Sequence, residues 1–245
     1  MATTRKQPPH TLVIDIGGTG IKMITTDGEA RPLTERARML TPQPATPEAV
    51  LEVIRELIAG QPGSHARVSV GFPGVVRHGV VHTAPNLSTD DWRGFDLATA
   101  LTDLTGHPTR AINDAELQGL GVIDGKGVEM VLTLGTGLGT GLYTDGVLVP
   151  NLELAHHPFE KRQTYEERVG NAERERVGNS KWRHRVLRAL VIIDHVFNPD
   201  LIHLGGGNAR KLDPEMLPAD VRLFDNVEGL SGGVRLWQGV AGTAS

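Results

Sequence analysis

The sequence predicts an α/β protein built from two similar halves. Short runs of β-branched residues alternate with segments in which apolar residues recur at helical spacing, and this alternation is typical of α/β folds. Each half begins with a strand, a glycine-rich turn and a second strand, at residues 11–26 and again at 128–144. We divide the chain of 245 residues into domains at 1–113 and 114–245, and we allow for a C-terminal tail that packs back on the first domain.

The elements of the first half follow from turn and capping signals. The run Thr11-Leu-Val-Ile-Asp-Ile16 ends at Gly17-Gly18 and resumes as a second strand, which indicates a glycine-hinged hairpin. Thr46 and Pro47 provide an N-cap and a first helical position for a helix that extends to Gly60. Beyond it we expect a strand at 68–70, a helix at 96–104 and a strand at 109–112.

The second half repeats this order of elements. We expect a helix at 115–122, strands at 128–134, 140–144 and 147–149, a long helix at 182–197 and a strand at 201–204. Apolar residues at helical spacing define the long helix, and Asn198-Pro199 end it. Glycines interrupt residues 227–240, which we interpret as a helix.

Composition and charge exclude several classes of protein. With 39% apolar and 22% charged residues, the chain has the composition of an ordinary globular protein. It contains no cysteine, which excludes disulfides, thiol nucleophiles and thiolate metal sites. A net charge of −4 gives no general attraction to nucleic acid. No segment resembles a signal peptide or a membrane span, so we expect a cytoplasmic protein with neither membrane nor nucleic-acid partners.

Three glycine clusters each follow an apolar strand, and they are the first candidates for a functional site. They comprise Gly17-Gly18-Thr19, Gly135-Thr136-Gly137 and Gly205-Gly206-Gly207. Glycine allows backbone N–H groups to approach the oxygens of a phosphate closely, although a single cluster of this kind can equally be a tight turn. The P-loop pattern is absent, and no cluster has the dinucleotide-binding spacing, which disfavours both of those classes.

Two aspartates stand at the ends of predicted strands. Asp15 can hold Mg²⁺ through water, because phosphate-bound Mg²⁺ prefers few carboxylates and several waters; the alternative is an aspartate that only forms a turn. Asp114 lies between a strand and a helix, where it can cap the helix. A carboxylate there can also accept the proton of an attacking hydroxyl, which is the base that phosphoryl transfer requires.

The ordered set of motifs resembles the ROK family of sugar kinases. Its members here are Asp15-Ile-Gly-Gly-Thr19, Gly71-Phe-Pro-Gly74, Ala84-Pro-Asn-Leu87, Asn113-Asp114-Ala115, Leu134-Gly-Thr-Gly137, Glu153-x-x-His156 and Leu204-Gly-Gly-Gly207. Within the family, Gly18-Thr-Gly-Ile-Lys22 and Val149-Pro-Asn-Leu-Glu-Leu154 most resemble the polyphosphate glucokinase branch. The resemblance implies a two-lobed, actin-like (ribonuclease H-like) ATPase and sugar-kinase fold, with substrate and donor meeting in the cleft.

The resemblance also implies a role for each matching residue. Asp114 would be the general base on the 6-hydroxyl of glucose, and Asp15 would orient Mg²⁺ through water. The other hydroxyls of the sugar would be bound by Asn86, Asn113, Glu153 and His156. The phosphate donor, polyphosphate or ATP, would be held by Gly17, Gly18, Thr19 and Lys22, by Gly135, Thr136 and Gly137, and by Gly205, Gly206 and Gly207.

The chain also departs from the family pattern. Ala155 replaces the glycine usual before the family's histidine, and His157-Pro158 follow it. The cysteine-containing zinc loop of longer family members is absent, and His156 and His157 have no third ligand at a suitable spacing, so we expect no zinc. Between Lys161 and Arg188 the chain has nine Lys or Arg and four Glu. This segment is either a solvated helix face or a basic path for a long anionic donor.

These observations favour a glucokinase that uses polyphosphate, ATP or both. As its partner in solution we expect a second copy of the chain, in a homodimer. The first alternative is an ATP-dependent kinase for another hexose, such as fructose or mannose. A sugar-sensing regulator of the same family is the second; it is disfavoured because such proteins carry an N-terminal helix-turn-helix module, whereas the first strand here begins at Thr11. Asp114 disfavours a sugar-binding module without catalytic activity.

Overall fold

The computed structural model describes residues 9–61, 63–225 and 231–238, which form two compact α/β units. The first unit contains residues 9–117 and 231–238, and the second contains residues 118–225. The division lies inside α4 (Asp114–Val122), a few residues after the boundary placed from the sequence. Within the described residues, no helix is long and apolar enough to cross a membrane.

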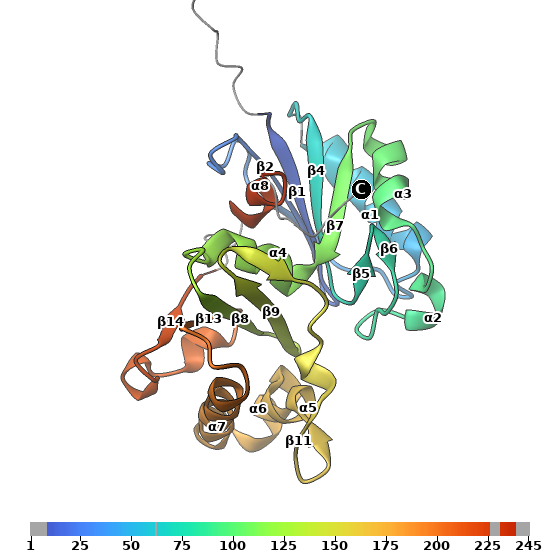
Figure 1. Ribbon diagram of the computed structural model, residues 1–245. Helices are drawn as coiled ribbons and strands as arrows, with labels where there is room; N and C mark the ends of the chain where they lie inside the picture. The colour runs from blue at the N-terminus through green and yellow to red at the C-terminus, as the bar shows by residue number, and fades with distance from the viewer. Residues whose placement is uncertain (1–8, 62, 226–230, 239–245) are drawn as a thin grey trace, which may run out of the picture. The chain divides into compact units, whose positions relative to one another are not determined.

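The first unit contains a five-stranded sheet in the order β3-β2-β1-β4-β7 (Figure 1). The strands β1 and β2 form the predicted hairpin, and β1, β4 and β7 are parallel. Its elements are β1 (Thr11–Ile16), β2 (Ile21–Thr26), β3 (Ala37–Met39), α1 (Pro47–Gly60), β4 (Arg67–Phe72), β5 (Val76–Arg77), β6 (Val80–Val81), α2 (Thr89–Trp92), α3 (Leu97–Thr105), β7 (Thr109–Asn113) and α8 (Gly232–Arg235).

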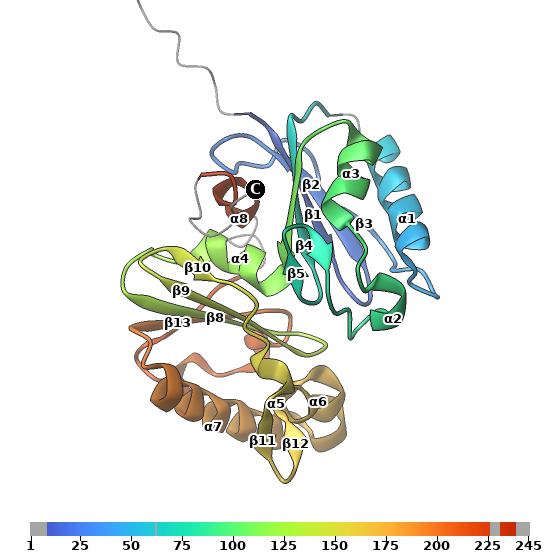
Figure 2. The same cartoon turned by 45° about the vertical axis from the view of Figure 1, so that its right-hand side comes forward.

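Helices cover both faces of this sheet (Figure 2). Leu12, Ile14 and Ile16 alternate along β1 and belong to the buried cluster that α1 completes with residues such as Ile54. Val13 points to the other face, where its side chain would be 2.4 Å from a Cβ placed on Gly233 of α8. Successive side chains of β1 point to opposite faces of the sheet, and both faces are covered, so nearly all of the strand is buried.

The segment around α8 is anchored to the sheet by polar contacts as well. Ser69 of β4 donates its Oγ hydrogen to the carbonyl of Gly233 at 2.6 Å and accepts from the indole Nε1 of Trp237 at 2.8 Å. The guanidinium of Arg110 lies 4.5 Å from the centre of the Trp237 ring and donates to the carbonyl of Leu236. Within residues 231–238 the helix interpretation of the segment 227–240 is confirmed for the single turn of α8. Residues 227–230 and 239–240 of that prediction lie outside the described residues.

The second unit repeats the arrangement of the first, with the sheet order β10-β9-β8-β13-β14. An antiparallel β8–β9–β10 meander is extended by β13 and β14, which are parallel to β8 and β13 respectively. Its elements are β8 (Val128–Leu134), β9 (Leu138–Thr144), β10 (Val147–Val149), β11 (Pro158–Glu160), β12 (Gln163–Thr164), α5 (Tyr165–Val169), α6 (Asn171–Val177), α7 (Asn179–Phe197), β13 (Leu201–Gly205) and β14 (Val221–Leu223), with short 3-10 turns η1 (Leu154–His156), η2 (Ala209–Lys211) and η3 (Pro214–Met216).

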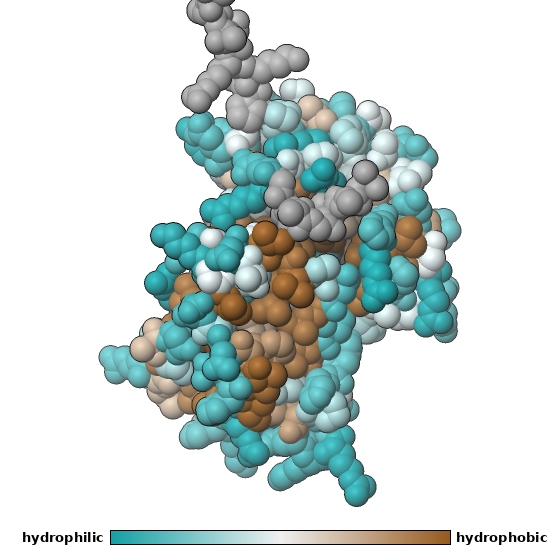
Figure 3. Space-filling model, in the orientation of Figure 1, coloured by the Kyte–Doolittle hydropathy of each residue, from teal (hydrophilic) through white to brown (hydrophobic). Residues whose placement is uncertain are grey.

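The long helix α7 packs on the second sheet through one apolar face. Trp182, Val186, Leu190 and Ile193 are buried there with Met130 and Leu132 of β8. The helix ends at Asn198, which adopts a left-handed conformation (φ 45°) before Pro199, as the sequence predicts. Figure 3 shows apolar residues gathered on the face of this unit that is turned to the viewer.

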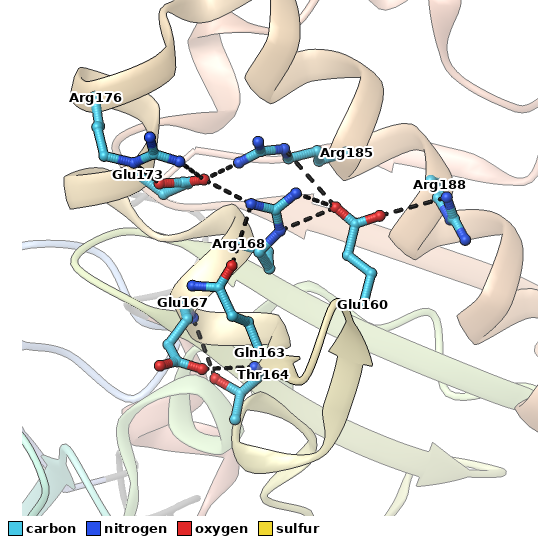
Figure 4. Close-up of polar contacts among 9 residues, drawn as sticks. All are labelled: Glu160, Gln163, Thr164, Glu167, Arg168, Glu173, Arg176, Arg185 and Arg188. Atoms are coloured by element: carbon cyan, nitrogen blue, oxygen red, sulfur yellow. Dashed lines mark hydrogen bonds and ion pairs between the residues drawn. The ribbon is translucent and has the colours of Figure 1, made fainter.

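A cluster of ion pairs joins the β11–β12 hairpin to α5, α6 and α7 (Figure 4). The buried guanidinium of Arg168 contacts Glu160 (2.9 Å) and Glu173 (2.9 Å), and Gln163 accepts a third bond. The carboxylate of Glu173 also accepts from Arg176 and Arg185, and Arg188 lies 3.4 Å from Glu160. Hydrogen bonding to Arg176 lowers the pKa of Glu173 to about 2, and bonding to Arg168 lowers the pKa of Glu160. We call these two carboxylates and four arginines the Arg168 cluster.

The Arg168 cluster makes stability depend on pH in the acid range. Because the pKa of Glu173 is lower in the folded chain than its ordinary 4.5, the stabilisation is complete above pH 4.5 and is lost as the pH falls toward 2. We expect Glu173→Gln to lower the free energy of unfolding at pH 7 by about 1–3 kcal/mol and to flatten its decline below pH 4.5. Urea unfolding at several pH values measures this. Glu215→Gln, at an exposed position of the same unit, should leave the profile unchanged; parallel profiles for wild type and Glu173→Gln would contradict the prediction.

Candidate functional site

The candidate residues of the first unit meet at one edge of its sheet. The strands β1, β4 and β7 are parallel and adjacent, so their carboxyl ends lie together. In the register, Asp15 is opposite Gly71 and Phe72 is opposite Asn113. Eight of the predicted site residues belong to this unit. They are Asp15, Gly17, Gly18, Thr19, Lys22, Asn86, Asn113 and Asp114.

Asn113, not Asp114, caps helix α4. The Oδ1 atom of Asn113 accepts hydrogen bonds from the backbone N–H groups of Ala115 (2.9 Å) and Glu116 (3.2 Å), and its Nδ2 donates to the carbonyl of Gly74 at 3.3 Å. Asp114 is the first residue of the helix and is partly buried. Its Oδ1 atom accepts a hydrogen bond from the backbone N–H of Ala115 at 2.8 Å, at the N-terminal end of the helix.

The start of α4 is in close contact with strand β4. A Cβ on Gly71 would lie 3.1 Å from the Cα of Asp114 and 3.4 Å from its Cβ. Any larger residue at position 71 would push the aspartate away from the sheet edge. Asn86 is held near the same edge, because a Cβ on Gly18 would lie 3.3 Å from the Cβ of Asn86. The first glycine turn and one predicted sugar ligand are thus neighbours.

Asp15 and Lys22 are ion-paired. Lys22 Nζ lies 3.1 Å from Asp15 Oδ2, across the β1–β2 pair in which the two residues are opposite each other. Both side chains are partly exposed, at 32% for Lys22 and 25% for Asp15. One hard carboxylate beside a glycine turn fits a Mg²⁺ ion that takes its other ligands from phosphate and water. The lysine keeps that carboxylate in place.

The second and third glycine clusters meet at one edge of the second sheet. Gly205 is opposite Thr133 in the parallel β8–β13 pair, so both strands end together. Gly206 has a positive φ of 87°, and a Cβ there would lie 2.5 Å from the carbonyl oxygen of Leu134. Asn208 closes the arrangement: its backbone N–H donates to Leu134 (2.9 Å), and its Nδ2 donates to the carbonyl of Gly135 (3.1 Å). The exposed Thr136 lies at the tip of the β8–β9 turn.

Glu153 and His156 lie on opposite ends of the short turn η1. His156 Nε2 lies 3.4 Å from Glu153 Oε2, and His156 Nδ1 lies 3.9 Å from Glu166 Oε2. Burial raises the pKa of Glu153, although the neighbouring His156 acts in the opposite direction. Glu153 is one of the residues that line a pocket of about 420 Å³, together with apolar residues such as Leu152, Phe159 and Ile193, and apolar surroundings disfavour a carboxylate charge.

The substitution of alanine at position 155 leaves His156 beside Glu153. Ala155 is buried, and its small side chain fits the turn. His157 is directed elsewhere: its Nδ1 lies 2.8 Å from the carbonyl of Pro158, and its ring lies 6.4 Å from that of Tyr165. The two adjacent histidines therefore have different surroundings.

Sequence reasoning missed Glu166, Asn171 and Asn208. A Cβ on Gly137 would lie 2.4 Å from Glu166 Oε1, so Glu166 lies between His156 and the second glycine turn. Asn171 donates its backbone N–H to Thr136 and accepts from Asn208 Nδ2. Asn208 directly follows the third glycine cluster, and that adjacency was an available signal. Glu166 and Asn171 have no such signal, because only the folding of α5 and α6 against the β8–β9 turn brings them there.

Sequence comparison identifies relatives of this chain. The model of the ROK family matches residues 11–150. The polyphosphate glucokinase of Mycobacterium tuberculosis is 36% identical over 222 residues, which are 86% of this chain and 82% of that protein. An N-acetylmannosamine kinase of Citrobacter koseri is 32% identical over 152 residues, covering 60% of this chain and 52% of that protein. The sequence resemblance to the polyphosphate glucokinase branch is thereby confirmed.

Solved structures confirm the predicted two-lobed, actin-like fold class. The inorganic polyphosphate/ATP-glucomannokinase of Arthrobacter sp. strain KM is similar with a TM-score of 0.83 and 34% identity, over 95% of this chain and all of that one. A ROK family glucokinase of Streptomyces griseus has a TM-score of 0.79 at 20% identity, over 94% of this chain and all of that one, and so shares the fold. The family model matches more than half of the chain, and a relative covered over most of its length is 36% identical. The chain therefore belongs to the ROK family of sugar kinases.

Proposed function

We propose that this protein is a glucokinase that transfers a phosphoryl group from polyphosphate or ATP to the 6-hydroxyl of glucose. The observation that carries the proposal is the position of Asp114 at the start of α4, on the sheet edge that also holds Asp15 and the first glycine turn. A base and a phosphate-binding turn in one unit are what phosphoryl transfer to an alcohol needs. The likeness to polyphosphate glucokinase and to polyphosphate/ATP-glucomannokinase supports this donor pair and this sugar.

The proposed roles follow from the chemistry of each group. Asp114 accepts the hydroxyl proton as the oxygen attacks phosphorus. The sugar's other hydroxyls bind Asn86 and Asn113 of the first unit and Glu153 and His156 of the second. Directional hydrogen bonds to these hydroxyls discriminate against analogues that lack them. The backbone N–H groups of the glycine clusters hold the phosphates of the donor.

Mg²⁺ is the cofactor that we propose for Asp15. When bound, it neutralises charge on the phosphate oxygens as the phosphoryl group is transferred. Asp15 would hold it through water, and the ion pair with Lys22 fixes the direction of the carboxylate. Lys22 itself adds a positive charge beside Gly17–Thr19.

Mannose is a second candidate acceptor, because one of the similar proteins acts on it according to its name. The similar Arthrobacter protein is described as a glucomannokinase, which makes mannose the first alternative acceptor to test. A coupled assay that compares glucose with mannose, and ATP with long-chain polyphosphate, tests the proposed function directly. Turnover of glucose with at least one donor is the expected result, and absence of glucose phosphorylation with both donors would refute the proposal, whether or not mannose is phosphorylated.

Replacement of the proposed base should affect the chemical step alone. We expect Asp114→Asn to lower kcat by about 10²–10⁴ while glucose binding and thermal stability change little, because the amide keeps the shape and the Oδ1 acceptor but cannot take a proton. Steady-state kinetics and calorimetry with glucose measure the two effects. Asp103→Asn, at an exposed position of α3, is the matched control. Near wild-type turnover by Asp114→Asn would remove Asp114 from this role.

Replacement of Glu153 should weaken glucose binding in a pH-dependent way. Loss of a hydrogen-bond acceptor to a buried hydroxyl costs about 1–3 kcal/mol, so we expect Glu153→Gln to raise the Kd for glucose and to leave donor affinity unchanged. Because burial raises the pKa of Glu153, the wild type should begin to lose glucose affinity above pH 4.5 as the pH falls, and the variant should lack that component. Calorimetry between pH 5 and 8 measures both; equal affinities in the two proteins would contradict the assignment.

Asn113 is a less informative position for this test. It caps α4 and bonds to Gly74, so Asn113→Ala removes a helix cap worth about 1 kcal/mol along with any contact to the sugar. The variant is therefore useful only when its free energy of unfolding is measured beside its affinity for glucose.

The homodimer expected from the sequence remains a prediction. Val191 and Val196 on α7 are 50% and 65% exposed, and burying such apolar side chains against a second copy of the chain is favourable. Sedimentation velocity at micromolar concentration should give twice the mass of one chain, and a single species of one chain's mass would refute the prediction.

A further inference from the structure

Six cations of the basic segment between Lys161 and Arg188 belong to two sets, the second of which also includes Arg210 and Lys211. The first set is the Arg168 cluster, in which Arg168, Arg176, Arg185 and Arg188 surround Glu160 and Glu173 (Figure 4). The lowered pKa values keep both carboxylates ionised near neutral pH. These arginines hold α5, α6 and α7 together, and a basic path that includes them is not supported.

The second set of cations lies beside the third glycine cluster. The Nε atom of Arg183 donates to the carbonyl of Lys211 at 2.6 Å, and that of Arg210 donates to the carbonyl of Gly207 at 2.9 Å. Among the residues that the structure describes, no carboxylate is ion-paired with Arg183, Arg210 or Lys211. A bond to a carbonyl orients a guanidinium without neutralising it, so two oriented positive charges lie here. The exposed side chain of Lys211, whose main-chain carbonyl Arg183 contacts, adds a third.

Hydrogen bonds connect this place to the second glycine turn. The Nδ2 atom of Asn208 donates both to the carbonyl of Gly135 (3.1 Å) and to Asn171 Oδ1 (3.2 Å). Asn171 Oδ1 also accepts from Arg174 Nη2 at 2.9 Å, and Arg174 Nη1 donates to Asn179 at 3.1 Å. The carboxylate recorded near Arg174 in the described chain is that of Glu175, at 3.6 Å and 64% exposed. Arg174 therefore retains most of its charge beside the glycine clusters.

We propose that Arg174, Arg183, Arg210 and Lys211, here called the cation cluster, bind the phosphates of a long polyphosphate beyond those held by the glycine turns. This inference rests on the proposed function and assigns its donor preference to named side chains. A chain of −4 net charge repels a polyanion overall, so a local excess of positive charge is needed to bind one. ATP carries only three phosphates and has none left for these cations once the glycine turns are filled.

The test compares two pairs of adjacent, exposed cations. Arg210→Gln with Lys211→Gln removes two charges from the cation cluster, and Lys161→Gln with Arg162→Gln removes two from the β11–β12 hairpin of the same unit. We expect the first pair to raise the KM for long-chain polyphosphate about tenfold, and to change the KM for ATP and for tripolyphosphate less than twofold. The second pair should change none of the three.

Salt dependence gives a second readout, which is measured first on the wild type and then on the variant. Each phosphate contact releases counterions, so the KM of the wild type for long polyphosphate should rise steeply with NaCl, and the KM for ATP much less. The logarithmic slope for polyphosphate should decrease by about 1.4–1.8 in the Arg210/Lys211 variant, since each phosphate contact contributes about 0.7–0.9. Calorimetry with long-chain polyphosphate in the absence of glucose should show the same loss of affinity without any turnover.

The possible outcomes separate this inference from the proposed function. Equal effects on polyphosphate and ATP, equal effects of the two variant pairs, or a salt-independent KM for polyphosphate would each overturn the role of the cation cluster. Glucose phosphorylation by ATP with no polyphosphate activity would overturn it as well, while leaving the proposed glucokinase with ATP as donor. Absence of sugar phosphorylation with either donor would instead refute the proposed function.

Discussion

Close approach of backbone to backbone at the carboxyl ends of parallel strands governs the arrangement of both units. Gly71 brings the start of α4 to the end of β4, and Gly206 brings the third glycine cluster to within contact of Leu134. A Cβ on Gly206 would lie 2.5 Å from the carbonyl oxygen of Leu134, a distance that real side chains do not tolerate. A Cβ on Gly71 would lie 3.1 Å from the Cα of Asp114, so the start of α4 would have to shift. Asp114 and the second glycine turn are therefore placed by the absence of side chains at two positions.

Arginines that are close together in the sequence have different partners in the structure, either carboxylates or main-chain carbonyls. Arg168 is buried and bonded to two carboxylates, and such a pair is costly to break because the remaining charge would be left without a partner. Arg183 lies on α7 near Arg185, yet it donates to a main-chain carbonyl and keeps its charge. The direction in which each residue leaves its helix determines whether its charge stabilises the fold or is available to an anion. Lys22 is intermediate, since Asp15 partly neutralises it at the surface.

Strong local signals predicted most of the regular structure. The hairpin of β1 and β2, the Thr46 cap of α1, four strands of the second sheet and the end of α7 before Asn198 all follow from apolar periodicity and turn residues, whereas the short edge strand β14 was not predicted. The elements β11, β12, α5 and α6 were not predicted, because they are short and rich in charge and have little apolar periodicity. They are held by Arg168 and its carboxylates, which come from three separate elements. The packing of α8 on β1 and β4 joins residues more than 160 positions apart, such as Ser69 and Trp237.

The sequence by itself determined the class of fold, the family and the residues that end each functional strand, because strand periodicity and glycine turns are local properties of the chain. Only the tertiary structure decided which residues are neighbours. In the folded chain Asn113 caps α4, and Asn208 donates a hydrogen bond to Gly135. Glu166 lies beside His156 and Gly137. The tertiary structure also divided the cations between the Arg168 cluster and the cation cluster. These outcomes depend on distances between elements that are remote in the chain, and the strength of an ion pair or hydrogen bond is determined by distance and burial, which the order of residues does not specify.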